Sequence, residues 1–296
     1  MATATVRFHL PAPPLRSAIS TYYILRILGP EVVEDIIHPE WANPRLVLTG
    51  QWQVRFAGKD HFETLPDAAL TGMLERGAVV RGSPGILIGM GVLPEGWVRL
   101  TGQSAAGFVD RLRPLSDAFG PGVEDLLARL REAESDVDAL TVLDAFFLDL
   151  IAERPSAPPI VARAHAALVT TQPRSVEGWA EDLAVPVRQL ERLCQRYFGM
   201  SPKRLLRRQR FLRTLAAMRD TPPGAWSGLI DSHFVDQSHF IHEFHYYLGM
   251  TPRAYFARSQ PFMREAGDQR MALLGAPVQG LHAPGDGPGP AAPSRQ

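Results

Sequence analysis

Apolar and polar positions alternate over short runs in the first 110 residues. Residues 45–49 and 52–56 read as strands around Gly50-Gln51, which predicts a hairpin. Residues 85–89 and 97–101 read as strands around a second turn-rich piece. Strands this short, separated by Gly and Pro, favour a sandwich or a small barrel over a parallel sheet. We therefore expect the first part of the chain to be β-rich.

The apolar spacing then becomes helical, and leucines recur every three or four residues over about 109–153. A broad apolar face covers 140–151. The Pro-rich run 154–159 interrupts the chain, and we place a domain boundary there. The prediction is a first domain over 1–154, with a β-rich part followed by this helical segment.

The region 160–259 reads as seven short helices separated by turns. Their expected ranges are 160–171, 176–183, 186–197, 202–219, 226–232, 237–248 and 252–258. Gly, Ala and Pro dominate the end of the chain, and such a composition cannot bury enough surface to order itself, so we expect 266–296 to be disordered. The predicted fold class is α+β with two domains, the first β-rich and the second all-α.

One apolar frame occurs twice in the second domain, fifty residues apart. In each copy a glycine ends one helix, and a proline three residues later starts the next helix. The sequence is Gly-Met-Ser-Pro in one copy and Gly-Met-Thr-Pro in the other. Two units of helix-turn-helix size in one chain suggest a tandem DNA reader. The matching positions are Leu190 and Phe240, Cys194 and Phe244, Tyr197 and Tyr247, Phe198 and Leu248, and Gly199 and Gly249.

Charge is unevenly distributed, although the whole chain of 296 residues has no formal net charge. Residues 1–159 hold 14 Lys+Arg and 20 Asp+Glu, a balance of −6, whereas residues 160–258 hold 14 and 8, a balance of +6. A basic domain joined to an acidic one is what a nucleic-acid binder with a separate regulatory module would show. The single cysteine, Cys194, excludes an intramolecular disulfide, and its match to Phe244 indicates a small buried hydrophobe.

A recognition helix must expose side chains that can bond base edges while its other face packs inward. In 186–197 the apolar face leaves Arg188, Gln189, Glu191, Arg192, Gln195 and Arg196 outside. In 237–248 the candidates are Gln237, Ser238, His239, His242 and His245, beside Ile241. Helix 202–219 adds Lys203 and Arg207 as candidate phosphate contacts within a basic run. For any single helix, the alternative is a solvated charged face.

On this doubled frame and the turn-helix start at 234–240, the region resembles the DNA-binding domain of AraC-type bacterial transcription regulators. The resemblance implies two helix-turn-helix units joined by a linker helix at 202–219. It implies double-stranded DNA and RNA polymerase as partners, with Gln237 and Ser238 near bases and phosphate. Relatives usually carry Arg or Lys where this chain has His242 and His245.

The first domain resembles, over 13–23, 65–72 and 88–97, a sensing domain that precedes such readers. This resemblance implies a β-rich, cupin-like domain that binds a small-molecule effector or forms a homodimer. Candidate residues of an effector pocket are Trp41, Arg45, Trp52 and Trp97, and core packing is the other interpretation of these aromatics.

Other classes of function find little support. Residues 102–106 lack the second glycine of a nucleophile elbow, so we expect no enzyme. His9, His38 and His61 are scattered, and we expect neither a metal nor a cofactor. The chain shows no signal-peptide pattern and no run of eighteen apolar residues, which predicts a cytoplasmic protein without a membrane partner.

The leading hypothesis is a sequence-specific transcription regulator in which two recognition helices read major-groove segments about 34–36 Å apart. Its first domain would control DNA binding through an effector or through dimerisation. One alternative is a β-barrel enzyme or small-molecule carrier whose helical domain binds protein partners. Another is a regulator without any ligand.

Overall fold

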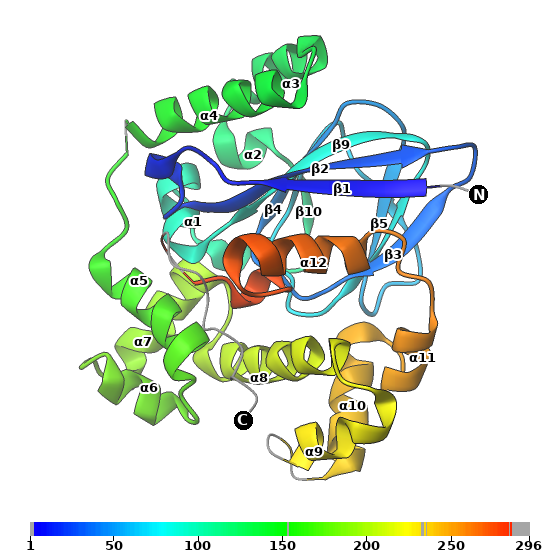
Figure 1. The fold of residues 1–296 in the computed structure, drawn as a ribbon. Coiled ribbons are helices and arrows are strands. Elements are labelled where there is room, and N and C mark those ends of the chain that lie inside the picture. The colour runs from blue at the N-terminus through cyan, green and yellow to red at the C-terminus, as the bar shows by residue number, and fades with distance from the viewer. Residues whose placement is uncertain (1–2, 153, 232–233, 235, 284, 286–296) are drawn as a thin grey trace.

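Two antiparallel sheets form the N-terminal part of the computed structural model, which describes residues 3–152, 154–231, 234, 236–283 and 285 (Figure 1). Six strands lie in the order β1-β2-β9-β4-β7-β10 and four in the order β3-β8-β5-β6. This confirms the β-rich first part and the helical second part. The strands are β1 Thr3–His9, β2 Ile19–Leu28, β3 Val33–Ile37, β4 Asn43–Val47, β5 Trp52–Phe56, β6 Glu63–Thr64, β7 Ala68–Thr71, β8 Ala78–Gly82, β9 Gly85–Val92 and β10 Leu112–Pro114.

The two sheets enclose one apolar core, and helices cover the outer face of the larger sheet. Inward-facing Phe8 and Leu25 of that sheet pack with Val54 and Val80 of the smaller one. On the outer face lies a second core, in which strand residues such as Tyr22 meet helical ones. The covering helices are α1 Pro94–Thr101, α2 Ser116–Phe119, α3 Val123–Glu132 and α4 Asp136–Ala152. Short 3-10 turns occur at Pro13–Leu15 and Ala105–Phe108.

Three local predictions for this half are wrong. The runs 45–49 and 52–56 do not form a hairpin, because β4 and β5 belong to different sheets and the chain between them turns a corner. Residues 97–101 are helical, since Pro94 starts α1 and Gly102 ends it in the left-handed conformation with φ 70°. The helical segment expected over 109–153 begins only at Ser116, because β10 first pairs with β7.

The C-terminal half consists of helices. They are α5 Pro159–Ala166, α6 Val176–Asp182, α7 Val187–Leu193, α8 Pro202–Arg219, α9 Trp226–Asp231, α10 Gln237–Leu248, α11 Pro252–Ala257 and α12 Met263–Leu274, with π-type turns at Ala167–Thr171 and Cys194–Phe198 and 3-10 turns at Pro223–Ala225 and Gln279–Leu281. Side chains cap the start of four of these helices: α6, α8, α10 and α11.

The fifty-residue repeat is visible in this geometry. Gly199 and Gly249 both adopt positive φ, 76° and 74°, at matching helix ends. Ser201 and Thr251 then cap the next helices by accepting backbone N–H groups three residues on. The two copies of the frame therefore fold alike.

Most of helix α12, from residue 266 onward, lies within the segment expected to be disordered. The expectation for 266–296 is wrong for its first part, because α12 and the turn Gln279–Leu281 pack against α8 and against the barrel that the two sheets form. Buried Asp35 holds the start of α12 by accepting the backbone N–H groups of Phe262 and Met263 at 3.2 and 3.0 Å. Burial raises the pKa of this carboxyl, and its three backbone hydrogen bonds act in the opposite direction. Residue 284 and residues 286–296 lie outside the described part.

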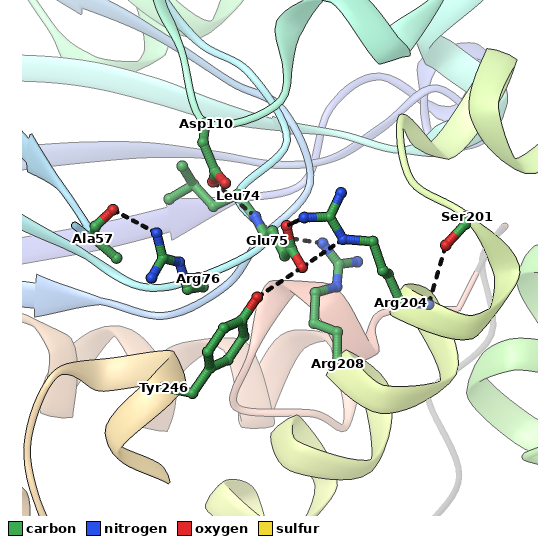
Figure 2. Close-up of polar contacts among 9 residues, drawn as sticks. All are labelled: Ala57, Leu74, Glu75, Arg76, Asp110, Ser201, Arg204, Arg208 and Tyr246. Atoms are coloured by element: carbon green, nitrogen blue, oxygen red, sulfur yellow. Dashed lines mark hydrogen bonds and ion pairs between the residues drawn. The ribbon is translucent and has the colours of Figure 1, made fainter. Parts of the chain in front are cut away.

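The loop after β7 fixes α8 and α10 to the barrel (Figure 2). The carboxylate of Glu75, 4% exposed, accepts from Arg204 Nε of α8 at 2.7 Å and from the Tyr246 hydroxyl of α10 at 3.1 Å. Arg208 of α8 donates to the carbonyl oxygens of Glu40 and Leu74 at 3.3 and 3.1 Å. This loop therefore sets where the C-terminal helices stand relative to the sheets.

Replacing the α12 methionine that enters the barrel core should destabilise the protein. Met263 is 6% exposed, and Met263→Ala should lower the free energy of unfolding by about 2 kcal/mol or more, because it leaves a cavity. Met271 on the same helix is 37% exposed, and Met271→Ala should change it by less than about 0.5 kcal/mol. Urea unfolding measures both. Equal, small effects would mean that α12 does not close the barrel.

Removing the carboxylate at position 75 should loosen the contact between barrel and helices. Glu75→Ala deletes one ion pair and one hydrogen bond, and the expected loss is about 1–2 kcal/mol of unfolding free energy. The loss is no larger because the Arg204 side chain is 55% exposed and can be rehydrated. Exposed Glu132 of α3 provides the control. An equal loss for Glu132→Ala would contradict the role of Glu75.

Candidate nucleic-acid interface

The helix formed by α7 and its continuation to Phe198 has the two faces that a recognition helix needs. Leu190, Leu193, Cys194 and Tyr197 are buried. All six polar side chains expected on the outside are exposed: Arg188, Gln189, Glu191, Arg192, Gln195 and Arg196. Arg and Gln in such positions can bond guanine or adenine with two hydrogen bonds each.

Cys194 lies on the packed side of this helix. Burial raises the pKa of its thiol, and the charge of Glu191 raises it further. Because the thiolate is the reactive form, this environment suits a small hydrophobic residue rather than a redox centre.

The barrel domain borders the outer face of this helix, residues 187–198, which is the first reader. Glu191, Arg192, Gln195 and Arg196 line an open groove of about 690 Å³, with Gly102 and Ser104 opposite. The contact is close at the helix end, where a Cβ added to Gly199 would lie 2.7 Å from Val109 Cγ2. Movement of the first domain would therefore change what surrounds the reading face.

The second reader, α10, exposes a smaller and more neutral face. Gln237, Ser238, His242 and His245 are exposed beside Ile241, while Phe240 and Phe244 are buried. The backbone N–H of His239 donates to the capping Asp236, and its half-buried ring lies 5.6 Å from that of Phe234. His239 is thus less accessible than its neighbours.

The linker helix α8 divides its basic residues between internal and external roles. Lys203 is exposed. Arg207 is paired with the buried Glu243 of α10, with Nε 2.8 Å from Oε2, and its guanidinium lies 4.3 Å from the centre of the Tyr246 ring. The hydrogen bond to Glu243 raises the pKa of Arg207. Arg207 therefore positions the second reader, a role that the sequence pattern did not reveal because Glu243 is distant from it in sequence.

Only two of the four expected pocket residues come together. Arg45 and Trp52 border a cavity of about 30 Å³ between the sheets. Trp41 is fully buried elsewhere, with the guanidinium of Arg208 3.9 Å from its ring, and Trp97 packs against Phe108 at 4.9 Å. Trp41 and Trp97 are core residues, so for them the packing interpretation is the better one.

The cavity has a second cation that the sequence pattern did not predict. Arg270 of α12 borders it, is 5% exposed and lies 4.7 Å over the Phe8 ring. Burial lowers its pKa, and no described group bonds its Nε. Glu40, which pairs with Arg45 at 2.7 Å, is the one acid on the cavity wall. Residue 270 was overlooked because it fell in the segment expected to be disordered.

The described residues contain no group of three or more His, Cys, Asp or Glu side chains arranged to hold a metal ion. None of their helices is both long and apolar enough to cross a membrane.

Comparison with known proteins identifies the C-terminal region. A family model described as a helix-turn-helix domain matches residues 179–258. No curated protein sequence matches the chain. Among solved structures, ToxT from Vibrio cholerae is similar with 12% identity and a TM-score of 0.43, over 79% of this chain and 96% of that one.

A second ToxT structure, from strain O395 with (E)-4-(8-methylnaphthalen-1-yl)but-3-enoic acid, has 11% identity and a TM-score of 0.43, over 86% and 97% of the two chains. The AraC-like transcriptional activator CuxR has 12% identity and a TM-score of 0.31, over 66% and 77%. The matched region, 179–258, holds both readers and the helix between them, and we conclude that this part of the chain is similar to a helix-turn-helix domain.

Proposed function

We propose that this chain is a transcription regulator that binds double-stranded DNA sequence-specifically through both readers. The observation that supports this most is the exposed polar face on each of two helices that end, turn and restart alike. A packed inner face holds each helix rigidly, so its outer side chains are pre-arranged for base edges. The basic balance of this region adds salt-dependent affinity for phosphate.

Selection of bound sequences from random double-stranded DNA tests this function directly. A regulator should enrich two short blocks about one helical turn apart. A carrier with a protein-binding helical domain should enrich nothing and show no mobility shift at low salt.

Arg192→Ala should weaken binding to the selected site by about 1–3 kcal/mol and relax the preference at one base pair. Arg192 is exposed in the middle of the first reader, where its guanidinium can reach a guanine edge. Competition binding against single-base variants of the site measures both effects. Exposed Arg129 of α3 is the control, and Arg129→Ala should do neither. An equal loss on every sequence would instead assign Arg192 to phosphate.

We further propose that the barrel cavity takes part in effector control and favours an anionic, largely apolar molecule. Two arginines and one glutamate border it, which leaves an excess of one buried positive charge among apolar side chains. A buried cation is stabilised by a bound anion. The free space of about 30 Å³ suits a small polar group only, so a larger effector requires α12 to move outward.

Small aliphatic and aromatic carboxylates should therefore raise the melting temperature of the protein in a concentration-dependent way. Arg270→Met keeps an unbranched apolar stem and removes the charge, and it should abolish the shift. Arg113→Met, at an exposed position, should keep it. If neutral analogues stabilise the wild type as well as carboxylates do, Arg270 does not select the ligand.

A further inference from the structure

Helix α8 carries a second basic surface, distinct from the contacts that fix it to the barrel. Its buried side faces the barrel through Arg208. On another side, an open groove of about 910 Å³ runs between α8 and the start of α6. Residues 172–177 form one wall, and α8 contributes Lys203, Leu206, Arg207, Arg210 and Arg213 to the other.

The groove carries positive charge that the described residues do not neutralise. Arg207 is paired with Glu243, but no described carboxylate forms an ion pair with Arg174, Lys203, Arg210 or Arg213. Glu177 is the one acid on the walls. The lining therefore holds four unpaired cations against one carboxylate, an excess of three positive charges.

Arg210 and Arg213 are held in place although no described carboxylate pairs with either. Arg213 Nη1 donates to the Leu168 carbonyl at 3.3 Å, and the Arg210 guanidinium lies 5.3 Å from the centre of the Phe234 ring. No described group bonds the Nε of either side chain. Burial, and then the charge of Arg210, lower the pKa of Arg213 to about 10. Two neighbouring cations repel each other, and both are partly desolvated. A bound anion would offset the repulsion and the desolvation cost.

The groove also lies where a duplex on both readers would pass. Ser175, the N-cap of α6, belongs to the first unit, and Phe234, which Arg210 contacts, precedes the second reader. Figure 1 shows α8 between the two units, with α6 near one end and α9 and α10 near the other. In helix-turn-helix docking the first helix of a unit crosses the DNA backbone. When two readers occupy successive major-groove segments, the intervening phosphates face the surface between them.

We propose that this groove, through Arg174, Lys203, Arg210 and Arg213, binds the phosphodiester backbone between the two major-groove segments. The proposal rests on the proposed function, since it requires DNA on both readers. Contacts of this kind add affinity without sequence preference, and each releases about one counter-ion. The groove sets the register of the duplex, while base choice stays with the two readers.

The test compares salt dependence in two variants. Arg210→Gln with Arg213→Gln should reduce the slope of log affinity against log salt by about two and weaken selected and unrelated sequences equally. Because Arg213 is partly buried, Arg174→Gln with Lys203→Gln changes two exposed groove residues instead, and the same reduction is expected. Arg113→Gln with Arg129→Gln removes the same charge from exposed positions of the first domain and should leave the slope unchanged.

The outcomes separate this proposal from the function it rests on. If the wild type selects no DNA sequence, the proposed function fails. If the wild type binds its selected site and neither groove variant lowers the slope, only the groove proposal is overturned. Adding inorganic phosphate at constant ionic strength tests whether the groove binds a free anion instead. The groove holds free phosphate rather than DNA if phosphate raises the melting temperature of the wild type but not of the groove variants, while the slope of log affinity against log salt is the same in all of them.

Discussion

The arrangement of the whole molecule depends on one fully buried cation, Arg208, between the two halves. Its guanidinium has left water for a site with two carbonyl oxygens and the face of Trp41. Burial lowers the pKa of Arg208 to about 10, so the site offsets only part of the desolvation cost. Such a group is stable only where its partners hold their places. The loop after β7 and helix α8 are therefore expected to move as one unit. Glu75 joins Arg204 and Tyr246 to the same unit.

Further contacts join the readers to the barrel. Tyr246, which bonds Glu75, is on the second reader, and the Tyr247 carbonyl accepts the N–H of Gly77 at 2.7 Å. Near the first reader, Gly102 and Ser104 border the same groove as Arg192. Helix α12 adds a further connection, because it follows the readers in sequence and closes the barrel with Met263 and Arg270. Packed residues thus connect the barrel core to both readers.

The sequence predicted best what depends on local periodicity. The doubled frame, its glycine stops and the exposed side chains of both readers required only helical spacing and capping residues. Where spatial neighbours decide, prediction failed. The β4–β5 corner looks like a hairpin because Gly50 suits either turn, and only sheet partners distinguish them. The spacing of Met263, Ala266 and Arg270 is helical, but the Pro-rich end of the chain concealed it. Of the cavity residues, Arg45 and Trp52 were predicted and Arg270 was not, since it is distant from them in sequence.

The basic run of α8 shows why charge alone does not assign function. Its arginines are identical in kind and only a few residues apart, yet their partners differ. Arg204 bonds the barrel loop, Arg207 the second reader, and Arg208 the interior between the halves. Each of these three arginines holds two parts of the protein together, because a carboxylate or carbonyl oxygens bind its guanidinium. Lys203, Arg210 and Arg213, like the buried Arg208, form no ion pair with a described carboxylate, and these three line one groove. Arg207 lines the same groove, so its side-chain partner Glu243, and not its place in the helical period, distinguishes it from the three unpaired cations, whose charge is left for a ligand.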